Sequence, residues 1–378
     1  MEIAYKDSRA FQAVALRVMK IFFTIKNINY LAGTERVTSI LSNALVSRGH
    51  EVGIISLIGS GEEPFYSFDE RVKLYYLAPP KDRHIFPFRD LRRIRCMRKI
   101  LLKENPDCVV FVDSGRSYVN VPAAKGFPTI TWEHLNIKAC NGPKRRLSRI
   151  LAVKYTDVIV SLTKGDAADY ETMFGAPVSI CMPNPVTIDT TKKCSLSGKR
   201  VLAVGRLDDQ KGFDMLLDAW SRIKNREGWS LRIIGSGKRY RALMSQIAIL
   251  GIGDSVEILP PTKDMIKEYT EASIYAMSSR YEGLPLVLIE AMSLGLPIVS
   301  FDCEKGPRDI IVPGVTGELV EDANVDKLAL SIEKLMNNAQ LLKSYSDASL
   351  IEAEKYNLNS IVERWEELVK RTIEIHNS

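Results

Sequence analysis

The sequence alternates short runs of β-branched and aromatic residues with longer segments of helical periodicity over nearly its whole length. This alternation is typical of parallel sheets whose strands are joined by helices. Strands are predicted in both halves of the chain, at 20–25, 51–57, 72–77, 108–112, 128–132, 157–162 and 178–181, and then at 200–205, 230–235, 256–259, 272–277 and 297–301. Helices are predicted between them, for example at 34–48, 213–226 and 325–337. The predicted fold class is therefore α/β, with two parallel-sheet units.

The chain has 378 residues, more than a single hydrophobic core usually serves. A segment rich in Pro, Ser, Thr and Gly at 182–199 interrupts the periodic apolar pattern and is typical of a domain boundary. We therefore predict five parts: an extension without assigned function at 1–18, a domain at 19–185, a linker at 186–199, a second domain at 200–357, and a C-terminal helix at 358–378. One face of that helix is apolar, which allows it to pack back on the first domain.

Composition limits the class of protein. Charged residues make up 26% and apolar residues 46% of the chain, which is typical of a soluble globular protein. No apolar run reaches the ~18 residues needed to cross a bilayer. The six cysteines form no CxxC pair, so zinc and redox motifs are disfavoured. We expect reduced thiols in a cytoplasmic protein.

The net charge of +6 is unevenly distributed. Residues 1–185 carry 27 basic and 18 acidic side chains, whereas the remainder carries 25 and 28. Much of the excess lies at 81–103 and 138–154, where basic and apolar residues alternate at near-helical spacing. The pattern is typical of helices that rest on an anionic membrane surface, although a solvated basic helix face explains either segment alone. No nucleic-acid-binding motif accompanies the charge, so we expect no nucleic-acid partner.

The segment SRYEGLPLVLIEA at 279–291 places Glu282 eight residues before Glu290 across the start of a helix. Gly283 and Pro285 mark that start, with Pro285 predicted at the first helical position. Two carboxylates near exposed backbone N–H groups can hold hydroxyls from two parts of one ligand, while the helix end attracts a phosphate. An ordinary amphipathic helix with Glu290 on its surface explains the same segment.

Other candidate ligand residues follow predicted strands. In VGRLDDQKGFD at 204–214, Arg206 lies at a strand end and Lys211 just before a helix, an arrangement suited to a diphosphate. Gly33 follows the first strand and would let backbone N–H groups approach an anion. His134 follows the strand at 128–132, where open α/β sheets present ligand-facing residues. Taken singly, each is also explained as an ordinary loop residue.

Together these segments resemble the retaining, nucleotide-sugar-dependent glycosyltransferases of family 4, which have the GT-B fold. The motifs that carry the resemblance occur in the order VGRLDDQKGFD, SSRYEGLPLVLIEAMSLGLPIVSFD, GPRDII and GVTGELV. The resemblance covers most of the chain from Met19 onward. It implies two Rossmann-like domains with parallel sheets facing an interdomain cleft, the N-terminal one binding the acceptor and the C-terminal one binding the nucleotide sugar.

The resemblance also implies roles for individual residues. Arg206 and Lys211 would bind the donor diphosphate, Glu290 the ribose, and Glu282 the transferred sugar, with His134 beside the sugar and phosphate. The catalytic set is then Glu282, His134, Lys211 and Arg206, and the donor-binding set is Gly33, Arg206, Lys211, Glu282, Gly283, Leu284 and Glu290. Ala32 departs from the family pattern, since relatives often carry a second glycine there, and this puts the closest phosphate contact of the Gly33 loop in question.

The same resemblance implies a metal-independent reaction without a cofactor, in which the UDP-sugar is a substrate. The sequence has no Asp-x-Asp motif; its closest string is Asp302-Cys303-Glu304. We expect same-face substitution, with Glu282 orienting the sugar. GPRDII resembles relatives that use UDP-linked galactose, glucose or their N-acetyl forms.

The basic first domain suits a lipid-linked glycan acceptor, as in bacterial cell-surface polysaccharide assembly, including lipopolysaccharide and capsule. We expect an enzyme that is peripheral on the inner face of the plasma membrane. Two alternatives are a nucleotide-sugar epimerase of the same fold and a non-catalytic sugar-nucleotide-binding protein.

Overall fold

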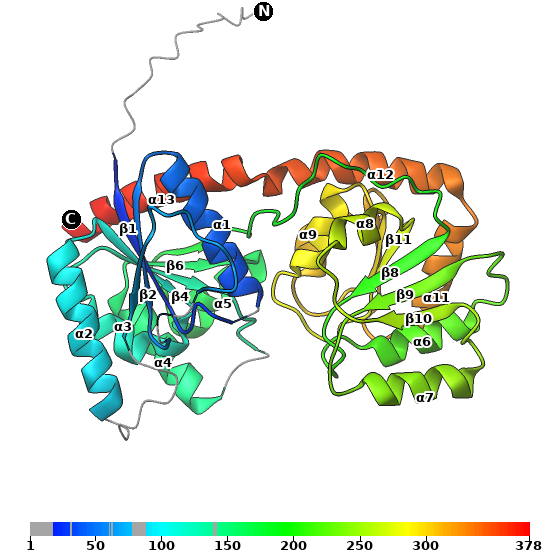
Figure 1. Cartoon of the computed structure of the whole chain (residues 1–378), viewed down its shortest axis with the longest axis horizontal. Helices are drawn as coiled ribbons and strands as arrows, with labels where there is room; N and C mark the ends of the chain where they lie inside the picture. The colour runs from blue at the N-terminus through cyan, green and yellow to red at the C-terminus, as the bar shows by residue number, and fades with distance from the viewer. Residues whose placement is uncertain (1–17, 31, 60, 62, 78–87, 139–141) are drawn as a thin grey trace, which may run out of the picture.

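The computed structural model describes residues 18–378 except 31, 60, 62, 78–87 and 139–141. The described chain forms two lobes, each built around one parallel sheet (Figure 1). The predicted α/β class with two parallel sheets is confirmed. Residues 1–17 of the predicted extension lie outside the described residues, as do parts of the basic segments 81–103 and 138–154.

The first lobe contains a parallel seven-stranded sheet with the order β3-β2-β1-β4-β5-β6-β7. Its strands are β1 (Lys20–Ile25), β2 (Glu51–Ser56), β3 (Lys73–Tyr76), β4 (Cys108–Val112), β5 (Thr129–Glu133), β6 (Val158–Ser161) and β7 (Ser179–Cys181). Residues 21–24 of β1 pair with β2 on one side and with β4 on the other, and the strand order reverses between β1 and β4. Loops leaving the carboxyl ends of β1 and β4 therefore diverge, and a crevice forms between them.

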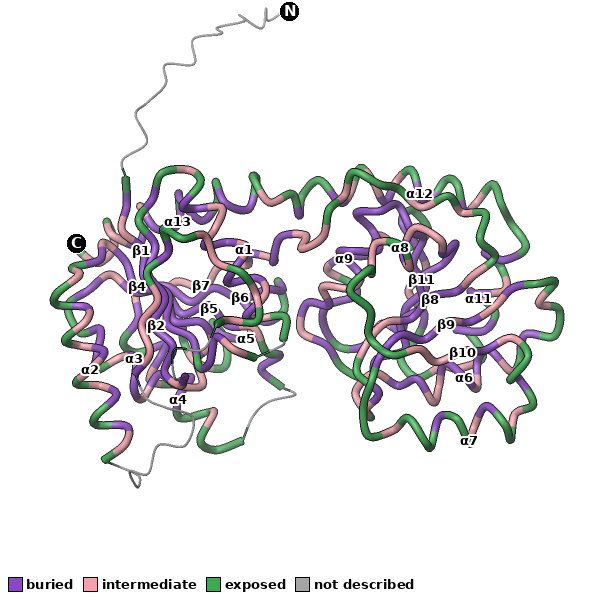
Figure 2. The backbone as a smooth tube through the Cα atoms, viewed as in Figure 1, coloured by how far each residue is buried: buried purple, intermediate pink, exposed green. Residues whose placement is uncertain are grey.

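Helices cover both faces of this sheet. They are α1 (Gly33–Ser47), α2 (Phe88–Glu104), the short η1 (Ser114–Arg116), α3 (Ser117–Ala123), α4 (Pro143–Tyr155) and α5 (Lys164–Phe174). Alternate residues of β1 point to opposite faces: Ile21 and Phe23 pack with α1, whereas Phe22 packs with α2 and α3. The buried strands inside a shell of exposed helix faces are visible in Figure 2.

The second lobe contains a parallel six-stranded sheet with the order β10-β9-β8-β11-β12-β13. Its strands are β8 (Arg200–Val204), β9 (Ser230–Ile234), β10 (Val256–Leu259), β11 (Ile274–Met277), β12 (Ile298–Phe301) and β13 (Gly317–Val320). Its helices are α6 (Phe213–Arg222), α7 (Tyr240–Leu250), α8 (Met265–Thr270), α9 (Leu286–Ser293), α10 (Pro307–Ile310) and α11 (Val325–Met336). Helices α6, α7 and α11 cover one face of the sheet, and α8 and α9 cover the other (Figure 1).

The last helices connect the lobes. After α12 (Ala339–Ala353) and η2 (Glu354–Tyr356), the long α13 (Leu358–Asn377) crosses back to the first lobe (Figure 1). There Glu366 accepts hydrogen bonds from Arg48 Nε, at 2.8 Å, and from Arg48 NH2, at 3.0 Å, and lies 2.8 Å from His50 Nε2. The C-terminal helix is thus bound to the N-terminal lobe by a partly buried ionic cluster as well as by apolar packing.

Several predicted bounds shift by one or two residues, and three differences have a clear physical reason. Strand β13 was not predicted, because its four residues carry little apolar pattern; it forms by pairing with β12, where a Cβ on Gly317 would lie 2.2 Å from Ile298 O. Helix α9 begins one residue later than predicted, since Pro285 has extended backbone and is its N-cap. Helix α6 ends at Arg222 and not at 226, because Ile223 turns into an extended conformation.

Candidate active site

The carboxyl ends of the two sheets face each other across the boundary between the lobes. Asn136, which follows β5, donates a hydrogen bond from Nδ2 to the backbone oxygen of Glu282, which follows β11, at 3.0 Å. A Cβ on Gly283 would lie 3.1 Å from His134 O. The loops that carry two predicted site residues, His134 and Glu282, are therefore in direct contact although they are far apart in sequence.

Lys211 and Glu282 form the centre of the site in the second lobe. Lys211 Nζ lies 2.6 Å from Glu282 Oε1, and both side chains are largely shielded from solvent. Gly212 fixes this position, because its φ of 60° is readily adopted only by glycine and a Cβ there would lie 2.1 Å from Ser278 O. Ser278 Oγ also donates to Lys211 O at 3.0 Å. The loop after β11 thus holds the cation against the carboxylate.

Arg206 follows the end of β8, but its side chain contacts its own loop and not the Lys211–Glu282 pair. Its guanidinium contacts Gln210 Oε1 at 2.9 Å and Asp208 Oδ2 at 3.3 Å, and 71% of its side chain is exposed. Among the described residues no contact joins it to the Lys211–Glu282 pair. An exposed arginine on a strand-end loop can swing towards a diphosphate at the cost of these two contacts.

Glu290 lies on α9 with both carboxylate oxygens engaged. Oε1 accepts from Arg36 NH1 at 2.9 Å and from Thr187 Oγ1 at 2.6 Å, and Oε2 accepts from Tyr269 OH at 2.9 Å. Burial and the neighbouring Glu290 raise the pKa of Tyr269, so its hydroxyl stays protonated and donates. A carboxylate offers about four lone-pair sites. Three of these sites are occupied, and the contact with Arg36 makes this position a junction between the lobes.

His134 follows Trp132 and Glu133 of β5, and its ring packs on that of Trp132 with centroids 4.3 Å apart. Its Nε2 is buried and has no hydrogen-bond partner within the described chain. Burial lowers the pKa of His134 to about 4, against the opposing effect of Glu133. The imidazole is therefore neutral at physiological pH, and an unpaired buried nitrogen is available to a ligand.

The remaining predicted donor residues line the interlobe boundary. Gly33 begins α1, and a Cβ there would lie 3.2 Å from Leu286 Cδ1 of the opposite lobe. Ala32 is the N-cap of α1 with φ −143° and ψ 168°, an extended conformation that any residue adopts, so its methyl group introduces no backbone strain. Leu284 is buried and lines a small cavity of about 240 Å³ near Tyr356.

Several interlobe contacts were not predicted from the sequence. Lys305 Nζ contacts Asp166 Oδ1 at 2.7 Å and also pairs with Asp169, and Lys138 pairs with Glu304. Arg36 and Glu290 are 254 positions apart. The sequence shows that Arg36 and Glu290 carry opposite charges, but charge alone does not identify an ion-pair partner so far away in the chain. In the part of the chain that the structure describes, no group of three or more His, Cys, Asp or Glu side chains is arranged to hold a metal ion.

Comparisons with known families cover both lobes. Residues 31–190 match the model of Glycosyltransferase Family 4, and residues 192–350 match that of Glycosyl transferases group 1. An uncharacterised glycosyltransferase of Haemophilus influenzae is 35% identical over 92% of this chain and 98% of its own. The amylovoran biosynthesis glycosyltransferase AmsD of Erwinia amylovora is 29% identical over 93% and 99%. A Campylobacter jejuni α-1,4-N-acetyl-D-galactosaminyltransferase, named for a PP-undecaprenol-linked glycan, is 26% identical over 93% and 98%.

Solved structures share the fold at lower identity. Sucrose-phosphate synthase from Thermosynechococcus elongatus superposes with a TM-score of 0.80 at 16% identity, covering 93% of this chain and 98% of its own. HepE from Anabaena, in complex with UDP and glucose, gives a TM-score of 0.77 at 16% identity over 93% and 100%. The predicted resemblance is thereby confirmed: this chain belongs to the family 4 glycosyltransferases and has the GT-B fold.

Proposed function

We propose that this glycosyltransferase moves a hexose or N-acetylhexosamine from a UDP-sugar to a lipid-linked glycan, with retention of the anomeric configuration. The observation that carries the proposal is the Lys211–Glu282 pair facing the His134 loop across the lobe boundary. A cation, a carboxylate and an unpaired neutral imidazole nitrogen match the diphosphate, the hydroxyls and the reacting end of a sugar nucleotide.

The proposed mechanism follows from the charge that develops. The bond between the anomeric carbon and the diphosphate oxygen breaks, and its electrons stay on the diphosphate. Lys211 and a reoriented Arg206 stabilise that charge. The acceptor oxygen bonds to the anomeric carbon on the same face, and its proton passes to a phosphate oxygen. Glu282 orients the sugar and holds Lys211 in place.

The choice of donor and acceptor is supported by relatives. HepE is described with UDP and glucose, AmsD is named for amylovoran biosynthesis, and the Campylobacter relative is named for a PP-undecaprenol-linked glycan. From these relatives we infer that this chain uses a UDP-sugar donor and a lipid-linked acceptor. We also infer that it acts in cell-surface polysaccharide assembly.

Membrane contact is proposed from the first lobe. Exposed apolar side chains lie beside basic ones on two helices: Phe88, Leu91 and Leu102 on α2, and Leu147, Ile150 and Tyr155 on α4. Among the described residues no helix is both long and apolar enough to cross a bilayer. The two faces suit peripheral contact with an anionic membrane on its cytoplasmic side. Flotation with anionic vesicles tests this: binding that falls with salt is expected, and indifference to lipid charge contradicts it.

The reaction is tested by following the anomeric proton of the product by NMR. We expect an α-linked product from an α-linked UDP-sugar, formed only when a glycan acceptor is added. A changed sugar without an acceptor identifies an epimerase, and tight UDP-sugar binding without turnover for any acceptor identifies a binding protein. A covalent glycosyl-enzyme in the wild type that is absent from Glu282→Gln would replace same-face substitution by a nucleophilic mechanism.

A further inference from the structure

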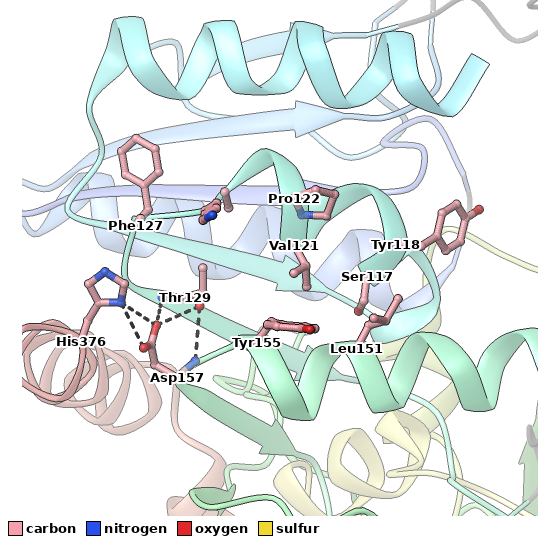
Figure 3. Close-up of a pocket in the computed structure, with 13 residues that line it drawn as sticks. Ser117, Tyr118, Val121, Pro122, Phe127, Thr129, Leu151, Tyr155, Asp157 and His376 are labelled. Atoms are coloured by element: carbon pink, nitrogen blue, oxygen red, sulfur yellow. Dashed lines mark hydrogen bonds and ion pairs between the residues drawn. The ribbon is translucent and has the colours of Figure 1, made fainter. Parts of the chain in front are cut away.

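A groove runs between α3 and α4 on the first lobe, outside the donor site. Its volume is about 490 Å³, within the range of small-molecule pockets. Figure 3 shows Val121 and Pro122 of α3 facing Leu151 and Tyr155 of α4, with Phe127 beyond them. The walls are therefore largely apolar.

At one end of the groove the carboxylate of Asp157 is already paired. Asp157 accepts from the backbone nitrogen and the hydroxyl of Thr129, at 2.7 and 2.8 Å, and lies 3.1 Å from His376 Nδ1 (Figure 3). This carboxylate is therefore not free to bind a ligand. Recognition along the groove then depends on apolar contact and shape.

The opposite end of the groove adjoins a basic pocket. Tyr118, at that end in Figure 3, has Lys144 Nζ 5.2 Å and Arg116 Cζ 5.8 Å from its ring centroid. Both cations also line a second cavity, of about 420 Å³, together with Lys26. Tyr118 is thus shared between an apolar groove and a cationic pocket.

The basic pocket lies at the carboxyl ends of β1 and β4, the switch point of the first sheet. Asp113 also lines it, but that carboxylate pairs with Arg145 and accepts from Gly115 N at 2.8 Å. Within the described chain neither Lys26 nor Lys144 forms an ion pair with a carboxylate. The pocket therefore keeps a positive excess that suits an anion.

We propose that the α3–α4 groove holds the hydrocarbon chain of a lipid-linked acceptor and that Lys26, Arg116 and Lys144 hold its phosphate groups. The inference rests on the proposed function and deepens it by assigning the acceptor lipid a site. Leu135, the residue after His134, also lines the basic pocket. A phosphate there places the attached glycan next to the loop that meets the donor lobe.

The basic and exposed apolar side chains of α4, which lines the groove, favour a lipid that arrives from an anionic bilayer. Helix α4 carries five basic and no acidic side chains, and its Leu147, Ile150 and Tyr155 are 58%, 44% and 54% exposed. From Lys144 to Tyr155 the helix spans about 16 Å at 1.5 Å per residue. The phosphate site at Lys144 and the far end of the groove at Tyr155 are thus about 16 Å apart along α4, a distance that a prenyl chain of several units spans.

Farnesyl diphosphate is a soluble probe of both sites, and its affinity is measured by calorimetry on the full chain. We expect binding to the wild type at least tenfold tighter than that of farnesol or inorganic diphosphate. Val121→Trp, which fills the groove, and Lys26→Ala with Lys144→Ala, which removes head contacts, each weaken it at least tenfold. Leu151→Gln provides a second groove variant should Val121→Trp not fold. The matched control is Ile249→Trp on exposed α7, which keeps wild-type affinity.

The outcomes separate this inference from the proposed function, because UDP affinity is measured in the same samples. Unchanged UDP affinity with lost farnesyl diphosphate binding in the groove variants supports the acceptor site. Absence of farnesyl diphosphate binding to the wild type, or wild-type affinity in both groove variants, overturns it. If farnesol binds as tightly as farnesyl diphosphate, the cations hold no phosphate, and the assignment of Lys26, Arg116 and Lys144 to the phosphate groups is overturned. Failure of UDP to bind contradicts the donor assignment alone.

Discussion

At the scale of single residues, two groups have surroundings that prepare them for a ligand. Lys211 is held 2.6 Å from Glu282 in a largely buried position, and His134 Nε2 is buried without a partner in the described chain. Both arrangements cost free energy in the absence of a ligand, since buried charge and unpaired polar atoms are desolvated. Such groups are expected where a ligand supplies the missing interactions.

Lys211→Ala is expected to lower kcat about 100- to 1000-fold, the loss typical of removing one preorganised group that stabilises developing negative charge. Steady-state kinetics with saturating UDP-sugar measures it. Lys238→Ala removes an exposed lysine that pairs with Asp209 and serves as the control, with kcat unchanged. A rise in KM with unaltered kcat in Lys211→Ala would show that the ammonium contributes to ground-state binding only.

The pH dependence of stability is predicted from His134. Its pKa is lowered by burial to about 4, below the ordinary 6.5, so the unfolded state takes up a proton before the folded state does. Stability from the neutral ring is complete above pH 6.5 and is lost as pH falls towards 4, by at most about 1.4 kcal/mol per pH unit. Urea midpoints between pH 7.5 and 4.5 should fall more steeply for the wild type than for His134→Gln. If the urea midpoints of the two proteins fall in parallel with pH, the low pKa assigned to His134 is contradicted.

At the scale of elements, short connections between strands and helices position the site. Gly212 lets α6 begin directly after Lys211, and the loop from β11 to α9 carries Glu282. Close backbone packing at Gly212 leaves no room for a side chain. These connections, more than the helices themselves, determine where the cation and the carboxylate meet.

Gly212→Ala tests this positioning. The change is expected to lower the free energy of unfolding by more than the ~1 kcal/mol of left-handed strain alone, because the new Cβ would lie 2.1 Å from Ser278 O. Gly251→Ala is a matched control, with φ of 64° against 60° and no atom within 4 Å of its Cβ. Equal destabilisation in denaturant titrations would show that the contact with Ser278 has no energetic role.

How well each element could be predicted from the sequence depends on how much of its pattern is local. Strands with continuous apolar runs, such as Cys108–Val112, were predicted at their observed bounds because two buried faces leave a clear pattern. Strand β13 was missed because its short sequence is defined by its neighbour β12. The orientation of Arg206 and the pairing of Arg36 with Glu290 depend on tertiary contacts that no local pattern encodes.

At the scale of the whole molecule, ion pairs between the lobes hold the two sheet edges together. Lys305 is nearly buried and pairs with Asp166 and Asp169 of the first lobe, and Arg36 pairs with Glu290 of the second. Helix α13 adds a fixed connection through Glu366 and Arg48. The proposed donor site at the lobe boundary therefore depends on how the lobes are arranged.

Lys305→Ala is expected to weaken this arrangement, because it leaves two neighbouring carboxylates without their shared cation. We expect a larger radius of gyration by small-angle X-ray scattering and a higher KM for the UDP-sugar. Lys327→Ala removes an exposed pair with Glu321 and should change neither quantity. An unchanged radius and KM in Lys305→Ala would show that the lobes are held by other contacts.

We propose that the donor diphosphate binds at the boundary between the lobes, where Lys211 and Arg206 neutralise it. A crystal structure of the full chain with UDP measures this directly. We expect the diphosphate beside Lys211, with Arg206 turned away from Gln210 towards the phosphates and the ribose against Glu290. UDP bound elsewhere, beyond the reach of both cations, would contradict the claim.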